Sequence, residues 1–202
     1  MTRFTAFLDA CVLVPIAPCD TLLRMADCGA FRPLWSEAVE EEALRALCEI
    51  HPDIDPSRFY SRFRSMNEAF EDARVSGWEP LVEGLELPDP NDRHVLAAAI
   101  RGRADVIVTE NVRDFPTTAL APLGMEAVRL DDFLLSQFDL SVTVTVQLIE
   151  DQARAMGRPR SRKTNCWNGW RAAGHLDSPM RSRPCWLPRE LRRGTSKNPV
   201  CS

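Results

Sequence analysis

Acidic and amide side chains surround two apolar runs in the segment Leu87–Pro116, LPDPNDRHVLAAAIRGRADVIVTENVRDFP. The segment contains four aspartates, one glutamate and two asparagines, most of them at the edges of the runs VLAAAI and DVIVT. A protein core rejects unpaired charge. These acids therefore either cap helices and turns or converge on something positive.

A second acidic run, Glu40 to Glu42, lies earlier in the chain and is expected to be helical. A run of charges is usually a solvated helix face, but helical geometry separates these three side chains. At about 100° per residue, Glu41 points away from the apolar stripe that begins at Val39, whereas Glu42 lies on its edge, four residues before Ala46. An acid at the inner edge of a helix needs a partner, so we favour Glu42 over Glu41 as a functional residue.

Asp89 and Asp92 both have a structural interpretation. Asp89 as the N-cap, Pro90 at the first helical position and Asp92 within the first turn would make a favourable helix start. We expect Asp89 to act as this cap. Asp92 can satisfy the helix and still project from its end, which leaves it available for chemistry.

The acids that follow strands can meet those that start helices. Asp9 follows the apolar stretch FTAFL, and Asn111 and Asp114 follow DVIVT, although each could also be a turn residue. In parallel sheets, ligands gather at the carboxyl ends of the strands. We therefore expect Asp9, Glu42, Asp92 and either Asn111 or Asp114 to converge at one sheet edge. Clustered carboxylates repel, and a hard divalent cation such as Mg²⁺ or Mn²⁺ relieves that repulsion.

The elements that would position these residues alternate between strands and helices, which indicates an α/β fold with a parallel sheet covered on both faces. Ser36 is expected to cap the helix that contains the glutamates, and Asp55 and Pro56 to start the next. We expect strands near 4–9, 31–36, 105–109 and 124–130, and helices at 20–31, 37–50, 55–75, 91–103 and from about Asp131.

Charge divides the 202-residue chain into two parts of opposite sign. Residues 157–202 hold eleven Lys or Arg and two acids, a charge of +9, and since the whole chain is at −4 the first 156 residues are at −13. The last segment has no helical or strand periodicity, so we expect it to lie outside the packed domain; a basic RNA-binding arm is the functional alternative.

The composition also limits the compartment. Seven cysteines show no metal-ligand spacing, which favours free thiols in a reducing environment and hence the cytoplasm. No stretch is long enough to span a membrane, and the apolar start is interrupted by Asp9 and Pro15, which is unlike a signal peptide.

Four segments in this order, FLDACVLV, LWSEAVEEEALRAL, LPDPNDRHVLAAAI and DVIVTENVRDFP, resemble PIN-domain proteins, the ribonuclease fold of VapC-type toxins. The resemblance covers residues 3–135, leaves 136–156 as a C-terminal helical extension, and implies a PIN-like three-layer α/β/α sandwich with a mostly parallel central sheet. By motif position, the acids of the family fall on Asp9, Glu42 and Asp92. The fourth position, often Asp in the family, is Asn111 here, and Asp114 lies three residues further on.

The resemblance implies cleavage of RNA phosphodiester bonds with Mg²⁺ or Mn²⁺, held by Asp9 and Asp92 with Glu42 direct or through water. It also implies a cognate antitoxin protein as a partner, and a homodimer. Arg93, His94 and Arg113 lie beside the acids in sequence and could hold the RNA backbone, although solvated surface positions explain them equally well.

Two other functions remain open from the sequence. One is an α/β phosphatase that uses strand-end aspartates; the haloacid type would have a second acid two residues after Asp9, where this chain has Cys11. The other is a catalytically degenerate PIN-like binding module. Metal-dependent RNA cleavage distinguishes the three, because the module would cleave nothing and the phosphatase would release phosphate from monoesters.

Overall fold

A computed structural model describes residues 4–140, 146 and 150–152 of the chain. Its centre is a five-stranded sheet in the order β3-β2-β1-β4-β5, in which every pair of neighbours is parallel. The strands are β1 Thr5–Leu8, β2 Arg32–Ser36, β3 Arg74–Val75, β4 Val106–Val108 and β5 Glu126–Val128.

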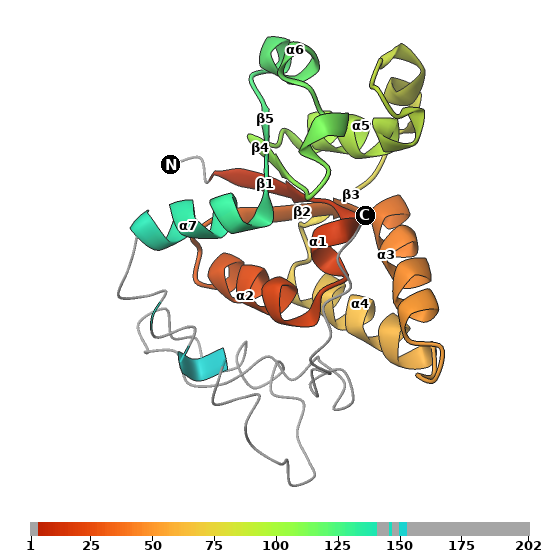
Figure 1. Ribbon diagram of the computed structural model, residues 1–202, viewed down its shortest axis with the longest axis vertical. Helices are drawn as coiled ribbons and strands as arrows, with labels where there is room; N and C mark the ends of the chain where they lie inside the picture. The colour runs from red at the N-terminus through yellow and green to blue at the C-terminus, as the bar shows by residue number, and fades with distance from the viewer. Residues whose placement is uncertain (1–3, 141–145, 147–149, 153–202) are drawn as a thin grey trace, which may run out of the picture.

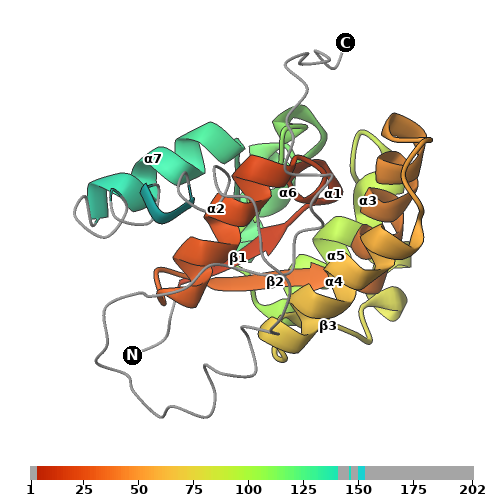
Figure 2. The same ribbon diagram turned by 90° about the horizontal axis from the view of Figure 1, so that it is seen from below.

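Helices cover both faces of this sheet (Figures 1 and 2). In Figure 1, α5 and α6 lie on one side of the strands, and α2, α4 and α7 on the other. The helices are α1 Ala10–Leu13, α2 Ile16–Asp27, α3 Glu37–Ile50, α4 Ser57–Ala69, α5 Arg93–Gly102, α6 Thr117–Leu120 and α7 Leu130–Leu140; the 3₁₀ turns are η1 Glu79–Gly84, η2 Pro90–Asp92, η3 Val112–Asp114 and η4 Ala121–Leu123. The predicted three-layer α/β/α architecture is confirmed, with a sheet that is parallel throughout the described strands.

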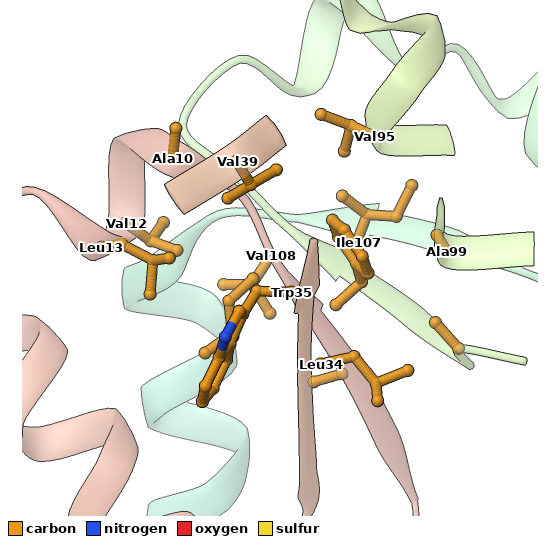
Figure 3. Close-up of a cluster of buried hydrophobic side chains, with 14 of the residues drawn as sticks. Ala10, Val12, Leu13, Leu34, Trp35, Val39, Val95, Ala99, Ile107 and Val108 are labelled. Atoms are coloured by element: carbon orange, nitrogen blue, oxygen red, sulfur yellow. The ribbon is translucent and has the colours of Figure 1, made fainter. Parts of the chain in front are cut away.

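The core is built from the apolar strands and from the inward stripes of the helices that pack on them. Trp35, Val39, Val95 and Ile107 are all fully buried and come from four different elements. Figure 3 shows these side chains gathered in one cluster around the central strands. The central strands β1 and β4 are buried along their whole length, and apart from Thr5 they consist of continuous apolar residues instead of an alternating pattern.

Two predicted helix caps are present. The Ser36 hydroxyl accepts a hydrogen bond from Val39 N at 3.3 Å, and α3 begins at the next residue. Asp89 Oδ1 accepts from Asn91 N at 2.8 Å at the start of η2, which leads directly into α5. Both caps satisfy backbone donors that a helix start leaves free.

The helix predicted over residues 55–75 is wrong over its last six residues. α4 ends at Ala69, and Arg74–Val75 form β3, which pairs with Trp35 and Ser36 of β2. A two-residue edge strand has no periodicity of its own, so its identity depends on the pairing partner. The helix expected over 20–31 begins earlier, at Ile16, and the short helix α1 was not anticipated.

Beyond the sheet, the described residues extend along α7 and then to a helical segment at residues 150–152. Gln152 is buried and contacts α2: its Nε2 donates to Ala17 O at 2.8 Å, and its Oε1 accepts from Thr21 Oγ1 at 2.8 Å. Part of the predicted C-terminal extension therefore packs on α2. The predicted tail, 157–202, lies outside the described residues. Within the described part of the chain, no helix has the length and apolar character needed to cross a bilayer.

Candidate active site

Asp9 lies at the carboxyl end of β1, at the centre of the sheet. Leu8 pairs with Val108 of β4, and Asp9 N continues the ladder by donating to Val108 O at 3.1 Å. This register places the residue after β1 beside the residue after β4, which is Thr109. Asp9 and Thr109 are 5% and 0% exposed, so their interaction occurs away from bulk water.

The Asp9 carboxylate is held by three hydrogen-bond donors. Oδ1 accepts from Ala10 N at 2.7 Å, and Oδ2 accepts from Thr109 Oγ1 at 2.6 Å and from Cys11 Sγ at 3.1 Å. Burial raises the pKa of Asp9, the three hydrogen bonds oppose that rise, and the negative charge of Glu42 adds to it. The orientation of this buried carboxylate is thus fixed by its surroundings.

Asp92 lies at the same edge because of the direction of α5. A helix that leads into a parallel strand runs antiparallel to it, so the N-terminus of α5 lies at the carboxyl ends of the strands. Asp89 performs the capping, and the Asp92 side chain makes no capping hydrogen bond. Burial and the charges of Asp9, Asp114, Asp89 and Glu42 raise the pKa of Asp92 to about 6. Asp92 is thus surrounded by like charge.

The three consecutive glutamates of α3, Glu40 to Glu42, have different neighbours. Glu40 is largely buried, its pKa is raised by burial, and it lies 3.8 Å from Arg74 Nε on the β3 side. Glu41 is exposed. Glu42 is the glutamate whose charge raises the pKa of Asp9 and Asp92, and its Oε2 lies 3.5 Å from His94 Nε2. The structure therefore brings Glu42 to the acidic edge.

Asn111 and Asp114 lie in the turn after β4. Thr109 Oγ1 accepts a hydrogen bond from Asn111 N at 3.0 Å, which ties this turn to the hydroxyl that also holds Asp9. Asn111 is exposed, whereas Asp114 is half-buried in η3 and its charge contributes to the raised pKa of Asp92. The side chain at this corner that acts electrostatically on the cluster is thus Asp114.

The three predicted RNA-binding residues lie at different depths. Arg93 and His94 are half-buried in the first turn of α5, and the Trp78 ring is 6.0 Å from the His94 ring. The Nε atom of Arg93 is buried and has no hydrogen-bond partner among the described residues. Arg113 is exposed in η3. A solvated surface position therefore describes Arg113, but not Arg93 or His94.

Two residues of the site were not selected from the sequence as parts of it. Thr109 and Cys11 both contact Asp9 Oδ2, and Cys11 Sγ also accepts from Glu110 N at 3.2 Å. Burial, followed by the charge of Asp9, raises the pKa of the Cys11 thiol to about 12, so the group stays protonated. The only signal in the sequence was position, since Thr109 ends an apolar run and Cys11 lies two residues after the acid.

The donor set fits a hard cation in chemical kind. Carboxylate and amide oxygens are the ligands that Mg²⁺ and Mn²⁺ take, and both burial and every neighbouring charge that acts on Asp92 raise its pKa, as expected where a cation would relieve repulsion. In the described part of the chain, however, no three His, Cys, Asp or Glu side chains are arranged to hold one ion. Coordination by three of these acids therefore needs side-chain rotation.

A parallel three-layer sandwich with acids at its carboxyl edge defines a class of α/β proteins in which ligands bind at the carboxyl ends of the strands. A family model described as PIN domain matches residues 5–113, more than half of the chain. The chain belongs to the PIN domain family. Asp9, Glu42, Asp92 and Asn111 all lie within the matched residues.

The chain is also similar to a protein of Mycobacterium tuberculosis (strain ATCC 25618 / H37Rv) named "Putative ribonuclease VapC50". The two are 55% identical over 58 residues, which are 29% of this chain and 34% of the relative. The similarity thus spans about a third of the relative's length. No solved structure gave a significant match.

Proposed function

We propose that this protein is a Mg²⁺- or Mn²⁺-dependent endoribonuclease, the toxin component of a VapBC-type toxin–antitoxin pair. Membership of the PIN domain family and the similarity to a protein named as a ribonuclease support this proposal. The observation that carries it is electrostatic: the charges of four acids from separate parts of the chain act together on Asp92, and of these only Asp89 caps the helix start that leads into α5. A helix start needs one cap, so the other acids have no structural role there.

The catalytic residues proposed are Asp9, Asp92 and Glu42. Asp9 and Asp92 would hold a divalent ion, with Glu42 direct or through water, and such an ion would supply Lewis acidity toward water and the RNA phosphate. Asp9 is suited to act as a metal ligand of fixed orientation, because three hydrogen-bond donors hold its carboxylate. Asn111 and Asp114 are proposed as the ligands at the fourth corner.

Arg93, His94 and Arg113 are proposed to bind the RNA backbone. All three lie on the two segments that carry Asp92 and Asp114, so a phosphate that reaches the acids passes close to them. Contacts of this kind position the substrate and do not read its sequence. The half-buried position of Arg93, with its unpartnered Nε, supports a role beyond surface solvation.

The partners proposed are an RNA substrate, a cognate antitoxin protein and a second copy of the chain in a homodimer. The antitoxin would have to neutralise the acidic edge, for which basic residues are suited. A cytoplasmic location is proposed from the cysteine pattern; Cys11, Cys19, Cys28 and Cys48 are free thiols in the described part of the chain.

A catalytically degenerate PIN-like binding module is the second candidate. Two observations favour it: Asn111 is neutral where the family often has an acid, and no three potential ligands are arranged to hold one ion among the described residues. For a phosphatase there is no corresponding observation, since Cys11 contacts Asp9 where a second acid would be required.

The test is incubation of the full chain with total RNA, in chelator and in Mn²⁺, with the cut sites mapped. We expect wild type to cleave RNA in Mn²⁺ but not in chelator. The variants Asp9→Asn, Asp92→Asn and Glu42→Gln should lose this cleavage. Two matched controls lose the same charge: Asp89→Asn keeps the cap, because Asn caps as well as Asp, and Glu41→Gln lies one residue away on α3. Both should retain cleavage. Undiminished cleavage by the three site variants would show that the site assignment is wrong. If wild type itself does not cleave RNA, the ribonuclease proposal is wrong and the binding module is the function that stays.

A further inference from the structure

Cys11 makes more contacts in the acidic site than its size suggests. Its Sγ lies 3.1 Å from Asp9 Oδ2, 3.5 Å from Thr109 Oγ1 and 3.2 Å from Glu110 N. The thiol therefore joins the start of α1, where Asp9 lies, to the turn after β4, where Asn111 and Asp114 follow.

The direction of these hydrogen bonds can be assigned. Glu110 N is a donor, so it occupies an acceptor position of the sulfur. Asp9 Oδ2 accepts, so the thiol hydrogen points to it. Thr109 also donates to Oδ2, at 2.6 Å. Both donors reach the same oxygen, one from α1 and one from the end of β4.

Because of these contacts, the two carboxylate oxygens of Asp9 differ in how many of their hydrogen-bond acceptor positions are occupied. A carboxylate offers about four acceptor positions, two on each oxygen. On Oδ2 both are taken, by Thr109 and Cys11, whereas on Oδ1 one is taken, by Ala10 N. The remaining position is on Oδ1. Without the thiol, Oδ2 would also have a free position, and the carboxylate could present either oxygen.

We propose that Cys11 is a positioning residue of the acidic site, which occupies Asp9 Oδ2 so that Oδ1 is the oxygen presented to a divalent cation. This inference rests on the proposed function, because it requires that Asp9 binds a cation. It assigns a role in binding to a residue that touches neither the cation nor the RNA. Residues that hold a metal ligand typically change affinity by about 10–100-fold when mutated.

The experiment measures Mn²⁺ affinity directly, without catalysis. Free Mn²⁺ gives an electron paramagnetic resonance signal that is lost on binding, so titration of the full chain yields a dissociation constant. Cys11→Ala and Cys11→Val remove the donor, the second while filling more of the space. Cys11→Ser keeps a donor. Cys48→Ala is the matched control, since Cys48 is also a half-buried free thiol, on α3.

We expect Cys11→Ala and Cys11→Val to bind Mn²⁺ about tenfold more weakly than wild type, at the low end of that range because a thiol is a weak donor. Cys11→Ser should restore most of the affinity, and Cys48→Ala should match wild type. Thermal unfolding in chelator identifies any variant that has lost its fold. If Cys11 had a packing role alone, the variants would shift the thermal midpoint without changing the Mn²⁺ affinity of the folded protein. Cys11→Ser would then not restore the thermal midpoint.

The inference is wrong if Cys11→Ala and Cys11→Val bind Mn²⁺ as tightly as wild type, or if Cys11→Ser is as weak as Cys11→Ala. In both cases the proposed function stands, because wild type still binds the ion. If wild type itself does not bind Mn²⁺, the metal dependence of the proposed function and this inference are both wrong.

Discussion

Asp92 shows how neighbouring acids control the behaviour of a single residue. Its pKa is raised from 3.8 to about 6, first by burial and then by the charges of Asp9 and the other acids. The folded protein therefore binds this proton more tightly than the unfolded chain does. The corresponding stability is fully present below about pH 3.8 and is lost as the pH rises through about 6.

In the metal-free protein, Asp92→Asn should remove the loss of stability that accompanies ionisation of Asp92. In chelator at about pH 7 we expect the variant to be more stable than wild type by about 1 kcal/mol, a value reduced for the partial exposure of Asp92 to solvent. Near pH 4 the difference should disappear, because wild type is then protonated. Urea unfolding at both pH values measures it, and Asp53→Asn, at an exposed position away from the site, should show no such trend. A difference independent of pH would contradict the assigned repulsion.

For individual residues, the sequence predicts which acids converge but not which residues hold them in place. Asp9 and Asp92 could be selected because each lies where an apolar run meets a loop, and an unpaired acid there needs an explanation. Thr109 could not, because its bond to Asp9 joins residues 100 positions apart and depends on the pairing of Leu8 with Val108. Spacing along the chain does not contain that register.

Among the elements, α5 is the one whose placement determines the site. It starts at the acidic edge with Asp92 and ends against the sheet at Gly102, close to β2 and β3. The left-handed residue that ends the helix is Arg103, with φ 55°, and not the glycine before it. Gly102 is instead required by packing, since a Cβ there would lie 2.5 Å from Leu34 Cδ1 and 2.9 Å from Val75 Cγ2.

Gly102→Ala should therefore destabilise the protein, although alanine is the better helix former. Leu34 is only 1% exposed, so its side chain has little space into which to move. We expect a loss of about 1–3 kcal/mol, the usual cost of overpacking a core. Gly84→Ala is the matched control, because a Cβ there meets nothing within 4 Å. Equal stability of the two variants in urea unfolding would show that α5 moves away from β2 at little cost.

The elements that the sequence predicted well are those with a long period or a local cap. α3 was located by its apolar stripe and by Ser36, both of which are properties of neighbouring residues. β3 was missed because Arg74 and Val75 continue an amphipathic run, and only pairing with Trp35 and Ser36 makes them a strand. Pairing with a strand distant in sequence therefore determined the structure of this segment, although its own pattern favours a helix.

For the molecule as a whole, the sequence shows a charge of +9 in residues 157–202 against −13 in the rest. Deletion of residues 160–202 should leave the thermal midpoint nearly unchanged, because that segment lacks the periodicity of a packed element. A fall of several degrees would show that it packs on the domain. If stability is unchanged but RNA binding becomes weaker and less dependent on salt, the segment acts as a basic arm.

Metal binding should link the acidic edge to the stability of the whole domain. Empty, the edge stores repulsion between Asp92 and the neighbouring acids, so Asp92→Asn should stabilise the protein by about 1 kcal/mol in chelator. Asp9→Asn should not, because it replaces one of two oxygens that accept hydrogen bonds with an amide nitrogen that cannot accept. Saturating Mn²⁺ should make wild type more stable than either variant. An ion bound only by the native state adds about 2.7 kcal/mol at a hundredfold excess over its dissociation constant, and both variants bind it more weakly.

Thermal unfolding of wild type, Asp9→Asn, Asp92→Asn and Asp89→Ala, each in chelator and in Mn²⁺, separates this linkage from ordinary structural effects. Asp89 is the internal control, since its Oδ1 caps η2 through Asn91 N and its loss should cost about 1 kcal/mol in both conditions. Turn or cap aspartates at positions 9 and 92 would give the same small effect with or without Mn²⁺. If wild type gains no more from Mn²⁺ than the Asp9 and Asp92 variants gain, the acids do not form a metal site, and the proposed metal-dependent ribonuclease activity is wrong with it.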